Sequence, residues 1–172
     1  MDYTLSVLVE NHPGVLAKIS GLLSGRGFNI RSIAAGETED PTITRITMVV
    51  AGDERVIDQV KKQLGRLVDV IKITDLTERP SVDRELALVK VSSSVSHRAE
   101  VFQIVDVFRA KIVDIAHKSL TIEITGVTEK VEALIAMLKP FGITEIVRTG
   151  KISIARGGTS TQMGAGRRTK EG

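Results

Sequence analysis

Apolar residues recur in the first half of the chain with two periods, one typical of strands and one typical of helices. In residues 3–9, leucine and valine alternate with polar residues, as in a half-buried strand. In residues 15–23 the apolar side chains stand three and four positions apart, as on one helix face, and Gly25 and Gly27 end that run. The predicted order is strand, helix, strand, strand, helix, strand, over residues 3–9, 15–23, 30–35, 42–50, 56–64 and 67–76.

The second half of the chain repeats this order. Its elements are expected at residues 86–91, 97–108, 112–115, 120–124, 131–138 and 143–147. Residues 77–83 are polar, contain Pro80 and carry no periodicity, which predicts a linker. The sequence therefore predicts an α+β fold of two tandem ferredoxin-like βαββαβ units. Their expected limits are residues 2–76 and 84–150, followed by a flexible basic tail at 151–172.

The composition excludes several kinds of chemistry. The chain has no cysteine, so disulfides, thiolate metal sites and a cysteine nucleophile are excluded. His12, His97 and His117 show no ligand spacing, so we expect no metal site. No apolar run approaches the ~20 residues that span a bilayer, and the first residues lack the pattern of a signal peptide. We therefore expect a cytoplasmic protein without a membrane partner.

The formal net charge of +3 comes from the C-terminus. Residues 156–172 hold Arg156, Arg167, Arg168 and Lys170 against Glu171, and the rest of the chain is balanced. Only 3% of the residues are aromatic, too few for the stacking surfaces of single-stranded nucleic-acid binders. We therefore expect no nucleic-acid partner.

The most informative segment is Glu10-Asn11-His12-Pro13-Gly14-Val15-Leu16, between the first predicted strand and helix. The free N–H groups of a helix N-terminus bind carboxylates. Pro13 lacks an N–H and presets the helical φ, and Gly14 lets a ligand approach the backbone, so the next amides can hold a carboxylate. Asn11 could accept from an ammonium group or cap the helix. A plain capping loop explains the same residues.

Asn29 is a second candidate, at the start of the second predicted strand. It is polar where a buried edge would prefer a β-branched residue, so it could face a ligand or a partner. The alternative is a strand-entry turn residue, which the preceding Gly25-Arg26-Gly27 favours.

Three other segments contain residue types found in active sites but lack the required pattern. Gly25 and Gly27 follow a helix, whereas the glycines of a dinucleotide site precede one. Glu37, Glu39 and Asp40 lie in a hydrophilic turn. The serines 92–94 lack the flanking glycines of a nucleophile elbow, and the sequence identifies no histidine to activate them. We therefore expect no catalytic residue.

The segments 5–16 and 25–33 resemble the start of acetolactate synthase small subunits, with Glu10-Asn11-His12-Pro13-Gly14-Val15-Leu16 carrying much of the likeness. Residues 40–47, 62–70 and 84–91 extend it. The resemblance runs from about residue 2 to residue 156 and says nothing about the tail.

The resemblance implies a non-catalytic regulatory subunit in the biosynthesis of valine, leucine and isoleucine. It implies an N-terminal ACT domain that forms a homodimer and holds valine, or another branched-chain amino acid, between two chains. The implied effector site comprises Asn11, His12, Pro13, Gly14, Val15 and Leu16 of one chain, with Asn29 and Ile30 of the other.

The family's C-terminal domain contacts the large catalytic subunit. Valine would exert feedback inhibition on the enzyme that this contact activates. Thiamine diphosphate, magnesium and FAD belong to that catalytic partner, and we expect no cofactor on this chain.

Two other functions use a similar architecture. A stand-alone ACT sensor of another enzyme or of transcription would share the first unit, and co-purification with a thiamine-dependent large subunit separates the two. An acylphosphatase-like hydrolase would need a glycine-rich cradle with an arginine, which residues 11–14 lack. A phosphatase assay tests it.

Overall fold

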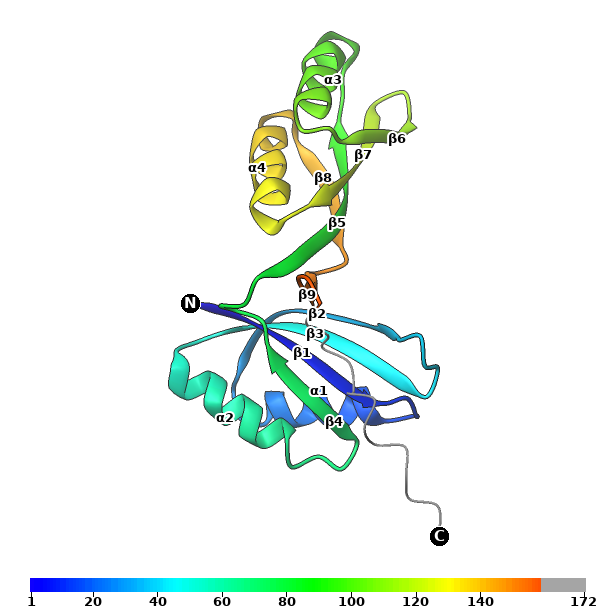
Figure 1. Cartoon of the computed structure of the whole chain (residues 1–172). Coiled ribbons are helices and arrows are strands. Elements are labelled where there is room, and N and C mark those ends of the chain that lie inside the picture. Colours follow the sequence, from blue (N-terminus) through cyan, green and yellow to red (C-terminus); the bar gives the residue numbers. More distant parts are fainter. Residues whose placement is uncertain (159–172) are drawn as a thin grey trace. The chain divides into compact units, whose positions relative to one another are not determined.

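The computed structural model describes residues 1–158 (Figure 1). The chain divides into two compact units, Met1–Val82 with Lys151–Gly172, and Asp83–Gly150. Each unit repeats the order βαββαβ, so the predicted α+β fold is confirmed. No helix among the described residues has the length and apolar character needed to cross a bilayer.

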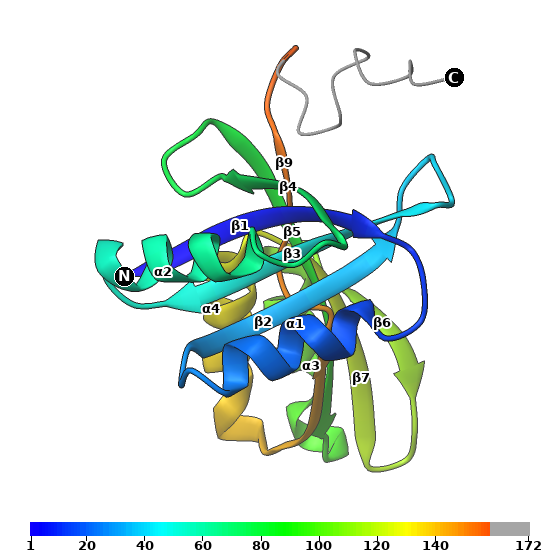
Figure 2. The same ribbon diagram turned by 90° about the horizontal axis from the view of Figure 1, so that it is seen from below.

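The first unit is an antiparallel sheet with two helices on one face. Its elements are β1 (Asp2–Glu10), α1 (Val15–Ser24), β2 (Asn29–Glu37), β3 (Ile43–Ala51), α2 (Glu54–Leu64) and β4 (Val70–Asp75). The strand order is β2-β3-β1-β4, which leaves β2 and β4 at the edges. Figure 2 looks onto α1 and α2, which cover the same face of this sheet.

The alternation along β1 builds the core of the first unit. Leu5, Val7 and Val9 are fully buried against the helices, where α1 contributes Ile19 and Leu23. Burying one such side chain stabilises a fold by about 1.5–3 kcal/mol. A segment therefore adopts the secondary structure that places its apolar residues on one buried face.

The second unit has the same topology. Its elements are β5 (Ser81–Ser92), a 3-10 turn (Val95–His97), α3 (Arg98–Val107), β6 (Lys111–Ile115), β7 (Ser119–Gly126), α4 (Thr128–Leu138), a 3-10 turn (Lys139–Phe141) and β8 (Ile143–Arg148). The strand order is β6-β7-β5-β8. Val89 and Ile122 of the sheet pack with Val101 and Leu134 of the helices.

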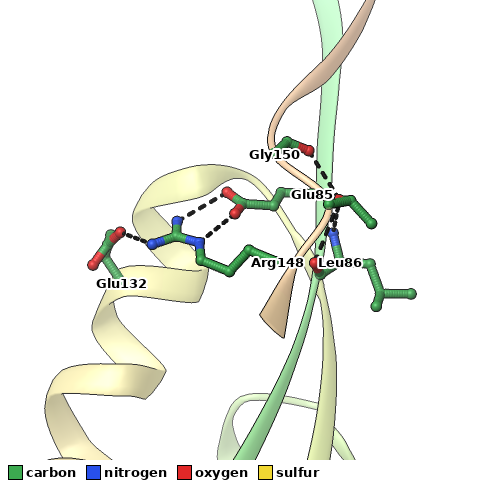
Figure 3. Close-up of polar contacts among 6 residues, drawn as sticks. Glu85, Leu86, Glu132, Arg148 and Gly150 are labelled. Carbon is green, nitrogen blue, oxygen red and sulfur yellow. Dashed lines mark hydrogen bonds and ion pairs between the residues drawn. The ribbon is translucent and has the colours of Figure 1, made fainter. Parts of the chain in front are cut away.

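An ion-pair cluster ties β8 to the start of β5 and to α4 (Figure 3). Arg148 Nε and a terminal nitrogen bind the two carboxylate oxygens of Glu85 at 2.5 and 3.1 Å, and another nitrogen binds Glu132 at 2.5 Å. Glu85 is 4% exposed, so its charge is removed from water and depends on Arg148. The two carboxylates raise the pKa of Arg148, and the hydrogen bonds that its guanidinium donates to Glu85 are the main cause.

Two expected segments differ from the structure. β5 begins at Ser81, inside the predicted linker 77–83, because strand pairing continues to that residue. The predicted flexible tail begins with a strand, β9 (Ile152–Ala155), which pairs with β5. Ser153 is buried there, and the Arg156 N–H donates to the Pro80 carbonyl at 2.8 Å. Residues 159–172 lie outside the described part, so flexibility there stays a prediction.

Candidate functional site

The β2–β3 turn holds Asn11 in the loop between β1 and α1. The Asn11 N–H donates to the Thr42 carbonyl at 2.8 Å. Its side-chain nitrogen donates to the Pro41 carbonyl at 2.8 Å and to the Glu37 carboxylate at 3.1 Å. The side-chain oxygen has no hydrogen bond to any described residue and lies on an exposed residue. Asn11 therefore offers an acceptor in a fixed position, as an ammonium site requires.

The N-terminus of α1 is open. Gly14 is its N-cap, with a left-handed φ of 89°, and no side chain caps the helix. Its first turn contains no acidic residue. The first helical hydrogen bond runs from the Lys18 N–H to the Gly14 carbonyl at 2.9 Å, so the amides of Leu16 and Ala17 precede it.

The helix α2 of the same unit has a capped N-terminus, unlike α1. The Asp53 side chain accepts from the Val56 N–H at 2.9 Å, and Glu54 lies in the first turn. A carboxylate of the chain therefore already occupies the N-terminus of α2. The N-terminus of α1 has the same donors and dipole without such a group, so it can take a carboxylate from outside.

The structure groups six of the eight predicted site residues. Asn11, His12, Pro13, Gly14 and Leu16 are exposed around the start of α1, with Leu16 46% exposed. Val15 differs because its side chain is buried in the core, so only its backbone faces the loop.

Asn29 and Ile30 lie at the other end of the sheet. They pair with Ala51 and Val50 of β3, whereas Glu37, the last residue of β2, pairs with Thr44. The eight steps from Asn29 to Glu37 correspond to about 26 Å along a strand. Within one chain these two residues are therefore remote from the loop that holds Asn11. Asn29 is exposed on the edge strand.

A network of charged side chains beside the loop was not predicted from the sequence. His12 Nε2 lies 3.0 Å from Glu10 Oε2 and 3.1 Å from Asp69 Oδ1, and Lys18 Nζ lies 2.9 Å from Asp69 Oδ2. Hydrogen bonding from Lys18 is the main cause that lowers the pKa of Asp69, and the charge of His12 adds to it. The signal in the sequence was the single carboxylate inside the apolar run 67–70.

The same residues contain a candidate group for a cation. One ligand atom each from Glu10, His12 and Asp69 lies within 4.8 Å of the others. The ammonium of Lys18 already neutralises Asp69, however, and a cation would have to compete with it. We therefore describe the group as an ion-pair network.

The corresponding corner of the second unit is different. Ser94 Oγ lies 2.8 Å from both Ser96 Oγ and His97 Nδ1, so the structure supplies the histidine that the sequence analysis did not find. These residues are exposed and close in sequence, and no described acid is bonded to His97 to orient it. The arrangement matches a local turn at the start of α3.

Two family models match the chain in tandem. The model "AHAS small subunit-like ACT domain" matches residues 5–72, and "Small subunit of acetolactate synthase" matches residues 84–157. The chain is 50% identical over 155 residues to the acetolactate synthase small subunit of Mycolicibacterium smegmatis, covering 90% of this chain and 91% of that one. It is 48% identical over 155 residues to that of Aquifex aeolicus, covering 90% and 81%.

A solved structure agrees with these matches. The acetolactate synthase small subunit from Thermotoga maritima superposes with a TM-score of 0.83 at 42% identity, covering 92% of this chain and 99% of that one. The two βαββαβ units, the matched segments and these relatives give one conclusion: the chain belongs to the family of acetolactate synthase small subunits, the regulatory and non-catalytic subunits of that enzyme.

Proposed function

We propose that the first unit binds valine, or another branched-chain amino acid, at the N-terminus of α1 and that this binding inhibits acetolactate synthase. The observation that carries the proposal is the uncapped N-terminus of α1, in a unit whose other helix is capped by Asp53. The α-carboxylate would accept from the amides at the start of α1. The α-ammonium would donate to the free side-chain oxygen of Asn11.

We also propose that the site is completed by a second copy of the chain. Asn29 and Ile30 cannot reach the Asn11 loop of their own chain, because about 26 Å of strand separates them. Two β2 edge strands that pair antiparallel across a two-fold axis would bring the start of one β2 towards the end of the other. That arrangement places Asn29 of one chain near Glu37, and hence Asn11, of its partner. The homodimer would then be part of the sensing device.

The second unit is our candidate for contact with the large catalytic subunit. In this proposal the holoenzyme works in the cytoplasm, and thiamine diphosphate, magnesium and FAD reside on the large subunit. The small subunit would activate that partner, and valine would favour the arrangement in which activation is lost. Such a shift requires valine to bind the two arrangements with different affinities, and the coupling is reciprocal.

Reconstitution tests the proposal. The purified chain is mixed with its large subunit, and acetolactate formation from pyruvate is measured with and without valine. Stimulation that valine reverses supports both activation and feedback. Valine binding to the isolated chain without stimulation would indicate instead a sensor of another protein.

A further inference from the structure

Asp69 lies directly before β4 and reaches both sides of the start of α1. Its Oδ1 contacts His12 Nε2 at 3.1 Å, two residues before Gly14. Its Oδ2 contacts Lys18 Nζ at 2.9 Å, four residues after Gly14. One carboxylate therefore holds the two ends of the segment 12–18, which contains all the open amides of α1.

Asp69 is itself held in place. The residue is 8% exposed, and its backbone carbonyl accepts from the Glu10 N–H at 2.9 Å. This bond joins it to the last residue of β1, from which the loop begins. His12 and Lys18 are far more exposed, with side chains 43% and 55% accessible. Asp69 is thus the fixed partner, and the side chains of His12 and Lys18 are the parts that it orders.

We infer that Asp69 is a positioning residue of the effector site. It fixes the backbone conformation of residues 12–18 and binds the side chains of Lys18 and His12. The effector carboxylate would therefore accept from the backbone amides and would not pair with a mobile side chain. The inference rests on the proposed function for the identity of the effector. Its structural half, the ordering of the loop, does not depend on any ligand.

Asp69→Asn tests the inference because it keeps the size of the side chain and removes its charge. Backbone ¹⁵N relaxation of the effector-free full chain should show increased fast motion in residues 11–17 and little change elsewhere. Valine affinity, measured by calorimetry on the same sample, should fall about tenfold, because valine binding must then order a loop that Asp69 no longer holds. Lys18→Met should weaken valine binding a fewfold, and Lys18→Arg should restore it.

Asp75→Asn is the matched control. Asp75 is the last residue of β4, and it pairs with Lys61 of α2 at 3.2 Å much as Asp69 pairs with Lys18 of α1. It lies at the far end of the strand from the loop. This variant should leave the relaxation of residues 11–17 and the affinity for valine unchanged, which separates positioning from a general loss of stability.

The outcomes are distinct. Unchanged relaxation of residues 11–17 in Asp69→Asn overturns the inference whatever valine does. Increased motion with unchanged valine affinity also overturns it, because the ordering would then not serve the site. Increased motion in a chain whose wild type binds no valine refutes the proposed function but leaves the loop-ordering role of Asp69 standing.

Discussion

Gly14→Asp places a carboxylate at the N-cap of α1, where the proposed effector carboxylate would lie. Gly14 has a φ of 89°, so any side chain there costs about 1–2 kcal/mol of backbone strain. A Cβ at this position would meet no atom within 4 Å, so steric clash with the chain adds nothing. The variant should therefore remain folded.

The effect on valine should be larger than the effect on stability. Two carboxylates about 4 Å apart repel each other by about 1–4 kcal/mol at effective dielectric constants between those of water and a protein surface. We expect valine to bind at least tenfold more weakly, corresponding to about 1.4 kcal/mol.

The assay is valine inhibition of the reconstituted enzyme. Gly14→Asp should still stimulate acetolactate formation but should resist valine. Gly14→Ala is the control, because it carries the same strain without the charge and should shift the inhibition less. Normal valine inhibition in Gly14→Asp would show that the effector site is elsewhere and that the open N-terminus of α1 has no role in it.

Three further predictions concern stability. Arg148→Met should destabilise the chain by about 3–5 kcal/mol in urea unfolding, because it leaves the buried Glu85 unpaired. Lys90→Met removes the exposed pair with Glu145 and should cost at most about 1 kcal/mol. Equal losses in the two variants would contradict this account. Asp53→Ala should cost about 0.5–2 kcal/mol in the same measurement by removing the cap of α2, and a smaller loss would mean that water replaces the cap. The pKa values of Asp69 and Asp75 are lowered in the folded chain, so their stabilising effect should be complete above the unfolded value of about 4 and should be lost as the pH falls through the folded values. The double variant Asp69→Asn/Asp75→Asn should accordingly flatten the fall of unfolding free energy between about pH 5 and pH 2, and an unchanged profile would assign that fall to other carboxyl groups.

The sequence by itself determined the order of elements and most of the core. Leu5, Val7 and Val9 were readable as one face of a strand because alternation is a local property of the backbone. The start of α1 was readable for the same reason, since the three-and-four spacing of apolar residues begins at Val15. These features need no knowledge of which strand lies beside which. Pro13 lies before the helix and Gly14 has a left-handed φ, which the pattern did not predict.

Only the tertiary structure decided which distant residues meet. Asp69 contacts Lys18 across 51 positions and Arg148 contacts Glu85 across 63, and neither spacing leaves a periodic signal. The pairing of β9 with β5 was likewise not predicted, because the apolar positions of β9 span only four residues next to the glycine-rich tail. Long-range pairs depend on strand order and register, which the whole set of packed elements fixes together, whereas sequence patterns report the preferences of neighbouring residues.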